Sequence, residues 1–260
     1  MQGASNDTPG AQGTAEPEDP PVDRRRWQGT ATIVRFNWPK YAAVAALAGA
    51  ASLSWRVGAP DPVRRILLAG AAVGVAGSAI SLAATWWVYD HRRVHDLIPR
   101  GLASVGSWAS VHAGFDDPTP DLARGVGHRP DAVVTLRLPP RPSRRGHGSV
   151  PVDPEVGRAG LAPGSLDTAF VTFAAHELRD PAHQRALFAD LAQALRPGGR
   201  LVRTEHLRDR SNLAVYGPAA FHFQPARTWI DRAAEAGLQQ ESDTPLTPFV
   251  HRLVWTRGPR

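Results

Sequence analysis

The chain has 260 residues, a formal net charge of +6 and no cysteine. The lack of cysteine excludes disulfides, thiolate zinc sites and cysteine nucleophiles, and the length allows one sizeable domain with an appendage. The positive charge comes almost wholly from arginine, since Lys40 is the only lysine. These arginines are scattered along the sequence rather than gathered on one segment, so we expect no nucleic-acid partner.

Residues 1–35 have the composition of a disordered, polar and basic tail. Up to about position 23 the sequence is rich in Gly, Ala, Pro and acidic residues without an apolar period, and three arginines follow at positions 24–26. Such a segment buries too little apolar surface to offset the entropy lost on ordering. We therefore expect no stable fold before residue 36.

Residues 36–90 are predicted to form a two-helix transmembrane hairpin. Residues 36–55 contain Lys40 as their single charged residue, and residues 66–89 contain none. Each run is long enough to cross a hydrocarbon core of about 30 Å, and aromatic residues stand near the ends of both. The alternatives are a buried hairpin of a soluble protein and a cleaved signal. The polar tail before the first run and the presence of two runs disfavour the signal.

The basic residues around these runs predict an orientation. Four arginines precede the first run and Lys40 lies near its start, which makes five basic residues on that side; three lie in the connection and three follow the second run. Because positive charge concentrates on the cytoplasmic side, both ends are predicted to lie inside the cell. The predicted localisation is the cell membrane, as a multi-pass protein that uses the lipid bilayer as a partner, with a cytoplasmic domain over residues 101–260.

Strand-like and helix-like segments alternate over residues 101–260. Residues 168–174 form a continuous apolar run, which is typical of a strand buried on both faces. Strands are also predicted at residues 107–113, 132–138, 200–205, 238–242 and 249–256, and helices at residues 181–195 and 227–236. This alternation predicts an α/β domain with a mostly parallel sheet.

Two turns carry a family resemblance. The stretch Gly164-Ser165-Leu166-Asp167 precedes the apolar strand, and Leu195-Arg196-Pro197-Gly198-Gly199-Arg200-Leu201 follows the next helix. In these turns the chain resembles class I S-adenosylmethionine-dependent methyltransferases. The resemblance implies a Rossmann-like sheet with an antiparallel C-terminal hairpin, S-adenosylmethionine as cofactor, and methyl transfer to a small or lipophilic acceptor. The alternative is an unrelated α/β domain with a Pro-Gly-Gly turn.

The first half of the domain departs from the family pattern. Residues 111–117, where the family has a glycine-rich loop, contain only Gly114. The second predicted strand ends at residues 136–140 without the acidic residue that grips the ribose in the family. These departures support a second hypothesis, a catalytically inactive methyltransferase-like module that binds partners or serves as a scaffold at the membrane.

The candidate site residues lie where the predicted strands end, because ligands of open α/β sheets bind at the carboxyl ends of the strands. The cofactor-binding candidates are His112, Ala113, Gly114, Asp116 and Ala175. The catalytic candidates are His176, Glu177, Glu205 and His206, since an imidazole or carboxylate can accept a proton from the methyl acceptor.

Each catalytic candidate has a structural alternative. His176 and Glu177 can instead cap the helix near Pro181, and Glu205 can instead form a salt bridge with Arg203 or Arg208. Asp116 can organise its loop, and His222 can line a substrate pocket or simply pack. No H-E-x-x-H spacing is present, because Asp180 stands four residues after His176, so no metal site is predicted.

Overall fold

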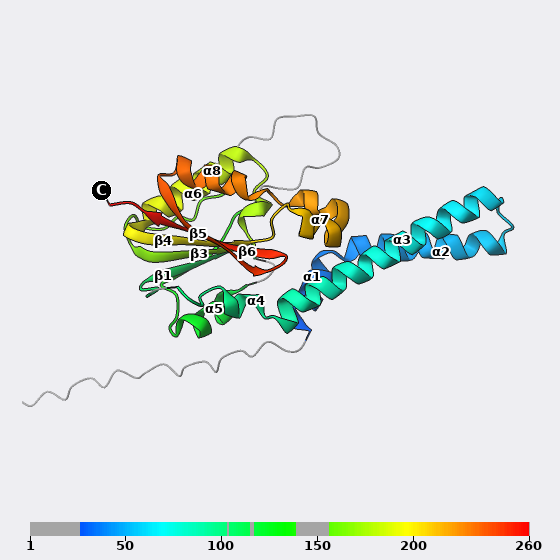
Figure 1. Cartoon of the computed structure of the whole chain (residues 1–260), viewed down its shortest axis with the longest axis horizontal. Helices are drawn as coiled ribbons and strands as arrows, with labels where there is room; N and C mark the ends of the chain where they lie inside the picture. The colour runs from blue at the N-terminus through cyan, green and yellow to red at the C-terminus, as the bar shows by residue number, and fades with distance from the viewer. Residues whose placement is uncertain (1–26, 103, 115–116, 139–155, 260) are drawn as a thin grey trace, which may run out of the picture.

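The computed structural model describes residues 27–102, 104–114, 117–138 and 156–259. Over these residues an α/β domain carries a long helical hairpin that projects away from one end of its sheet (Figure 1). Residues 1–26 of the predicted tail lie outside the described residues.

The hairpin begins earlier than the sequence predicts. Residues 28–35, which we assigned to the disordered tail, lie in helix α1 (Gln28–Phe36). The carboxylate of Asp90 accepts hydrogen bonds from the backbone N–H groups of Gly29 and Thr30, both at 2.9 Å. These bonds satisfy donors that a helix N-terminus leaves free, and they attach α1 to a segment 60 residues further along the chain.

Helices α2 (Trp38–Arg56) and α3 (Asp61–Trp86) form the projecting part of the hairpin (Figure 1). Gly70 and Gly74 of α3 face Leu47 and Val44 of α2, where an added Cβ would lie 3.4 and 3.3 Å from the neighbouring side chain. Small residues therefore let the two helices approach closely, as in packed membrane helices.

The structure supports only part of the transmembrane prediction. In the described part of the chain one helix, Asp61–His91, is long and apolar enough to cross a membrane, and its most apolar 18-residue stretch has a mean hydropathy of 2.0. Two transmembrane helices are not shown. The first predicted run falls short because α2 begins with Trp38, Pro39 and Lys40 and ends with Arg56.

Helix α3 continues directly into a π-helical turn, η1 (Trp87–His91), and the short helix α4 (Val94–Leu97) leads into the domain. The domain contains a six-stranded sheet in the order β2-β1-β3-β4-β6-β5. Its strands are β1 (Trp108–His112), β2 (Ala132–Thr135), β3 (Leu166–Thr172), β4 (Leu195–Glu205), β5 (Leu238–Thr247) and β6 (Val250–Arg257).

The first four strands are parallel, and β6 runs antiparallel to both β4 and β5. The mixed sheet with an antiparallel C-terminal hairpin confirms the predicted α/β fold class.

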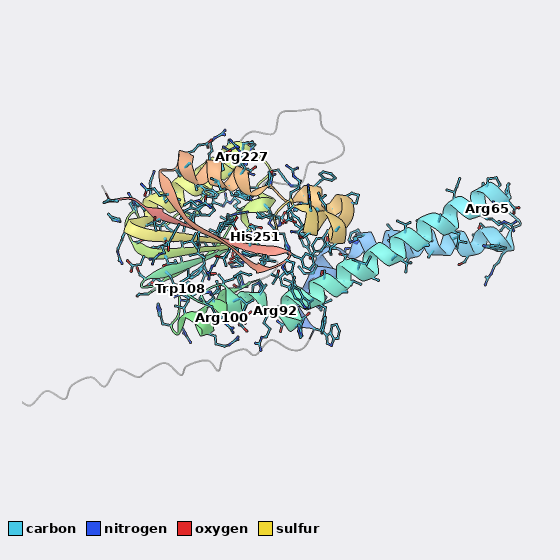
Figure 2. The ribbon with its side chains drawn as sticks, viewed as in Figure 1. Arg65, Arg92, Arg100, Trp108, Arg227 and His251 are labelled. Atoms are coloured by element: carbon cyan, nitrogen blue, oxygen red, sulfur yellow. The ribbon has the colours of Figure 1, made fainter. Side chains whose placement is uncertain are left out.

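Helices cover both faces of this sheet. Helices α6 (Pro181–Ala194) and α8 (Ala226–Glu235) lie on one face, and α5 (Thr119–Val126) lies with α4 on the other (Figure 1). Phe188 of α6 packs between Trp229 and Trp255 on the first face, and Trp108 meets Phe170 edge-on on the second. The side chains fill the space between these layers (Figure 2).

The two turns that carry the family resemblance hold the starts of the strands together. Asp167 accepts a hydrogen bond from the backbone N–H of Ser107 at 2.8 Å and forms an ion pair with Arg196 at 2.7 Å. Gly198 has the positive φ of +78° that the Pro-Gly-Gly turn predicts. Gly199 does not share that conformation. It is needed for space, since a Cβ there would lie 2.9 Å from the carbonyl oxygen of Arg196.

Candidate functional site

The carboxyl ends of β3 and β4 carry the candidate site. After β3, Phe173 adopts a φ of +47°, which is uncommon for an aromatic residue, and the chain turns into the 3-10 helix η2 (Ala175–Glu177). Strand β4 ends at Glu205 beside it, because Thr172 of β3 pairs with Thr204 of β4. The parallel register therefore brings the segment 175–177 next to Glu205.

Glu205 connects three residues inside the domain. Its Oε2 lies 2.6 Å from Nδ1 of His176, and its Oε1 accepts a hydrogen bond from the backbone N–H of Ala175 at 3.1 Å. The guanidinium of Arg203 lies 3.2 Å from Oε1 and stacks over the ring of Trp229, 3.6 Å from its centroid. Glu205 and Arg203 have no exposed surface, so this group is a fully buried charge network.

Burial and charge act in opposite directions on these groups. Burial alone would lower the pKa of His176, but the carboxylates of Glu205 and Glu177 outweigh it and raise the pKa to about 9. Burial would raise the pKa of Glu205, yet the charges of His176 and Arg203 keep it below its usual value. Burial lowers the pKa of Arg203 to about 10. The network therefore holds two cations around one buried carboxylate.

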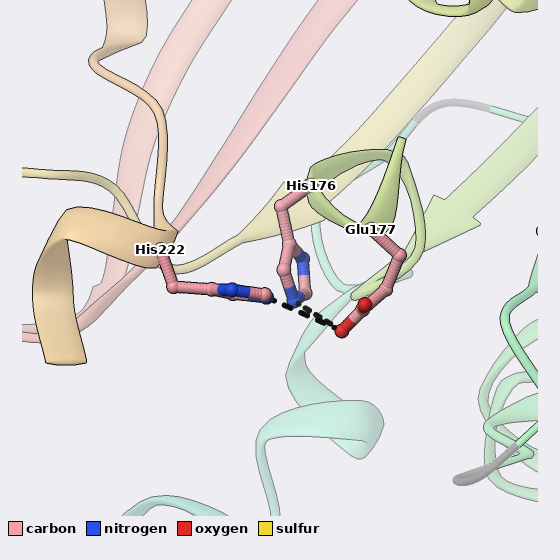
Figure 3. A group of neighbouring side chains, drawn as sticks. All are labelled: His176, Glu177 and His222. Atoms are coloured by element: carbon pink, nitrogen blue, oxygen red, sulfur yellow. Dashed lines mark hydrogen bonds and ion pairs between the residues drawn. The ribbon is translucent and has the colours of Figure 1, made fainter. Parts of the chain in front are cut away.

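The other face of His176 meets a second carboxylate. Nε2 of His176 lies 3.4 Å from Oε1 of Glu177, and Nε2 of His222 lies 3.4 Å from the same oxygen (Figure 3). His222 ends the 3-10 helix η3 (Gly217–His222), which follows α7 (Arg210–Tyr216). Hydrogen bonds from the two imidazoles lower the pKa of Glu177 against the opposing effect of burial.

A cavity of about 360 Å³ opens beside this cluster. One wall comes from the strand ends and from η3, and the other comes from the hairpin. The lining residues are Ile33, Phe36, Asn37, Lys40, Tyr41, Ser81, Thr85, Tyr89, Phe173, His176, Glu177, His206, Tyr216, Ala219, His222 and Phe223. The hairpin is therefore part of the site and not only an appendage to it.

His206 joins the hairpin to the sheet. Its Nδ1 lies 2.8 Å from the carbonyl oxygen of Phe249, and its Nε2 lies 3.0 Å from the hydroxyl of Tyr89. Burial lowers the pKa of His206 to about 4. A neutral imidazole has one N–H donor. The carbonyl oxygen of Phe249 requires that donor at Nδ1, so Nε2 accepts a hydrogen bond from the Tyr89 hydroxyl.

The predicted catalytic residues are thus brought together: His176, Glu177 and His206 line one cavity, and Glu205 supports His176 from behind. They do not cap the following helix, because the side chain of Asp180 accepts the hydrogen bond from Ala182 there. The predicted salt bridge between Glu205 and Arg203 is also present. The structural alternative for Glu205 is therefore present, in the same buried network that contacts His176.

The predicted cofactor-binding residues lie at two places. His112 and Gly114 follow β1, where Nδ1 of His112 accepts a hydrogen bond from the backbone N–H of Gly114 at 3.1 Å. Ala175 instead lies beside Glu205. His112, Ala113, Gly114 and Ala175 are not among the residues that line the 360 Å³ cavity. Asp116 lies outside the described residues.

Sequence reasoning missed two members of the site. Tyr89 is one of the aromatic residues near the ends of the predicted membrane spans, yet its hydroxyl contacts His206. Arg203 was considered only as a partner for Glu205, although a charged residue inside a buried strand is a signal of an internal ion pair. His222, for which the sequence left both pocket lining and packing open, lines the cavity, but nothing in the sequence linked it to Glu177.

The structure is similar to several solved proteins. They include a SAM-dependent methyltransferase from Aquifex aeolicus, at 14% identity over 70% of this chain and 98% of that chain, with a TM-score of 0.46. The N-methyltransferase NodS from Bradyrhizobium japonicum, in complex with S-adenosylhomocysteine, matches at 16% identity over 67% and 92%, with a TM-score of 0.44. The cyclase SpnF matches at 13% identity over 67% and 83%, with a TM-score of 0.46.

These likenesses have TM-scores below 0.5 and assign no activity or substrate to this chain. No protein-family model matches the chain, and no curated protein matches it.

Proposed function

We propose that the chain is an S-adenosylmethionine-dependent methyltransferase that acts on a small or lipophilic acceptor at the cytoplasmic surface of the cell membrane. The observation that carries the proposal is the cavity between the strand ends and the hairpin, with His176 and Glu177 on its wall. The sequence turns at residues 164–167 and 195–201 and the antiparallel C-terminal hairpin support the choice of reaction.

The residues after β1 fit a nucleoside cofactor through one feature. Gly114 has a φ of +89°, and a Cβ at this position would lie 3.1 Å from Cγ2 of Thr135. A bare backbone at the end of the first strand lets a ligand approach closely. His112, Ala113 and Gly114, with Ala175 on the neighbouring strand end, would hold the cofactor, which supplies an electrophilic methyl group.

The cavity wall supports a lipophilic acceptor. Phe36 and Tyr41 from the hairpin line the cavity together with Tyr216 and Phe223 from the domain. Lys40 lines it as well, with its Nζ 3.3 Å from Oγ of Ser81. Aromatic side chains bind apolar groups and exclude water, which favours alignment of the acceptor. The ammonium group offers a donor for one polar or anionic group of that acceptor.

His176 is placed to accept the proton that the acceptor loses. Glu205 holds Nδ1, so Nε2 is the nitrogen on the side of Glu177 and the cavity. Above its pKa of about 9, Nε2 is unprotonated and accepts a proton from an oxygen or nitrogen nucleophile, and the buried carboxylate stabilises the imidazolium that results. His206 is less suited to this role, because its Nε2 already accepts a hydrogen bond from the Tyr89 hydroxyl.

The exposed face of the hairpin supports the membrane location. Ile66 and Val73 of α3 are 71% and 73% exposed, and only 11% of the most apolar stretch of that helix is buried. A continuous exposed apolar surface of this kind marks contact with lipid or protein. Arg92 and Arg100 lie near the base of the hairpin and Arg65 near its tip (Figure 2).

Calorimetry with S-adenosylhomocysteine on the detergent-solubilised full chain tests the reaction class. We expect saturable binding at one site, and Gly114→Val should weaken it by about tenfold or more. Gly237→Val is the matched control, because Gly237 also has a positive φ but lies far from the site with no atom near its added Cβ. If the unmodified chain does not bind, the proposed methyl transfer is wrong.

One observation favours a second candidate function, a binding module without cofactor. The ring of His112 accepts a hydrogen bond from the backbone N–H of Gly114 and lies 3.4 Å from the Thr135 hydroxyl. Polar groups at the end of β1 are therefore already bonded to other protein groups and not left for a cofactor. Under this hypothesis the hairpin cavity still binds a lipophilic molecule, while S-adenosylhomocysteine gives no heat of binding.

A further inference from the structure

Two imidazoles and one carboxylate meet at the edge of the cavity. The ligating atoms of His176, Glu177 and His222 all lie within 4.8 Å of one another (Figure 3). They come from η2 and η3, which are separated by about 40 residues in the sequence. No short sequence motif contains all three residues. The search for an H-E-x-x-H motif therefore could not find the group, and we predicted no metal site.

Two of the three separations within the group match those of neighbouring ligands around one ion, and all three lie within 4.8 Å. Oε1 of Glu177 lies 3.4 Å from Nε2 of His176 and 3.4 Å from Nε2 of His222. At a tetrahedral centre with bonds of about 2.0–2.1 Å, adjacent ligand atoms are about 3.3–3.4 Å apart. These two pairs therefore need little movement to share a cation.

His176 also has the support that metal-binding histidines usually have. Its Nδ1 lies 2.6 Å from the buried carboxylate of Glu205, which fixes the ring and directs Nε2 toward Glu177. A carboxylate on the second nitrogen orients an imidazole ligand and raises its basicity. Glu205 is held in turn by Arg203 and by the backbone N–H of Ala175.

All three residues also line the 360 Å³ cavity. The side chains become more exposed outward, from 7% for His176 through 15% for Glu177 to 31% for His222. An ion among them would thus have protein ligands on one side and space for a further ligand on the other. Two histidines and a glutamate with one open position are a donor set of catalytic zinc sites.

We propose that His176, Glu177 and His222 bind one divalent transition-metal ion of the zinc class, whose open coordination position faces the cavity. The ion takes the place of the proton on Nε2 of His176. A water or hydroxyl group bound at the open position then loses its proton more readily, because the cation stabilises the resulting anion. The metal site stands whether or not the chain transfers methyl groups.

Arg179 is the charged neighbour that such a site must displace. Its guanidinium contacts Nδ1 of His222. When Nε2 of His222 binds a cation, Nδ1 carries a proton and no longer accepts one, so the arginine has to turn away. Removing this positive charge should therefore strengthen metal binding.

The test is a Co²⁺ titration of the full chain in detergent, without a polyhistidine tag and after treatment with a chelator. Co²⁺ is used because its visible absorption reports the number of its ligands. We expect one equivalent to bind with the spectrum of a four- or five-coordinate ion, and Zn²⁺ to displace it. His222→Gln and Glu177→Gln should each weaken binding by about 100-fold, and Glu205→Gln by about 10- to 100-fold.

Two further variants separate this site from adventitious binding. His251→Gln removes an imidazole that has its own carboxylate partner, Asp243 at 2.7 Å, and should leave the affinity unchanged. Arg179→Gln should raise the affinity. The proposal is overturned if the unmodified chain binds no stoichiometric Co²⁺, or if His222→Gln, a change at a partly exposed position, folds normally and binds as tightly as the unmodified chain.

Discussion

Oε2 of Glu205, the last residue of β4, lies 2.6 Å from Nδ1 of His176 in the turn after β3. The two residues are 29 positions apart, and the parallel pairing of their strands brings them into contact inside the domain. Because Arg203 contacts the same carboxylate, the orientation of a cavity-lining imidazole depends on a charge network that has no exposed surface.

Glu205→Gln should lower the free energy of unfolding by about 3–5 kcal/mol, since it leaves the guanidinium of Arg203 buried without a counter-charge. Urea unfolding of the detergent-solubilised protein measures the change. The double variant Arg203→Met with Glu205→Gln should lose less stability than Glu205→Gln alone, because it removes the uncompensated charge. If both variants lose the same free energy of unfolding, Arg203 and Glu205 do not stabilise the domain through their mutual interaction.

His206 should make the protein less stable as the pH falls from about 6.5 toward 4. Its pKa is lowered to about 4 by burial, so below pH 6.5 the unfolded chain binds a proton that the folded chain does not. Stability should fall by up to about 1.4 kcal/mol per pH unit across this window and be unaffected by this group above it. Thermal unfolding at pH 7, 6 and 5 measures the slope, and His206→Phe should reduce it.

Asp90→Ala should release α1 from the rest of the hairpin. The substitution removes the acceptor for the backbone N–H groups of Gly29 and Thr30, which is expected to cost about 1–2 kcal/mol locally. Hydrogen exchange of the amides of α1 reports the loss as faster exchange. Asp61→Ala at the distal end of the hairpin should leave the exchange of α1 unchanged. Protection that persists in Asp90→Ala would show that other contacts hold α1.

Val73→Arg should weaken attachment to membranes. Val73 is 73% exposed near the middle of α3, where an arginine would face hydrocarbon at a cost of about 2.5–3.5 kcal/mol. Flotation with anionic phospholipid vesicles measures the bound fraction. Val57→Arg, at the tip of the hairpin beside Arg56, should float like the unmodified chain. A chain that stays soluble without detergent and does not float would refute the anchor.

The sequence predicts β3 and the start of β4 well because the sequence signals for these elements are local. The apolar run at residues 168–174 and the Pro-Gly-Gly turn at residues 197–199 lie where the structure has β3 and the start of β4. Helix α1 was missed because its N-terminus is satisfied by Asp90, which is distant in sequence. Local composition alone cannot reveal such a partner.

In the candidate site, too, the sequence predicts what depends on local signals and misses contacts between distant residues. His176 and Glu205 were each expected at a strand end, which follows from the topology of parallel sheets. Their contact depends on the strand register, and the approach of His222 depends on how η3 folds back over η2. The participation of Tyr89 depends on the docking of the hairpin. These are tertiary arrangements that no spacing in the sequence records.

Helix α3 enters the π-helical turn η1 without an intervening loop, and this continuity has a geometric consequence. Ser81, Thr85 and Tyr89 recur every four residues along one side of this continuous helix, and all three line the cavity. One residue inserted near Thr85 would rotate the distal part of the hairpin by about 100° and shift it by about 1.5 Å. The orientation of the hairpin and the shape of the cavity beside His176 are thus coupled, because a bend in this helix would move three of the residues that line the cavity.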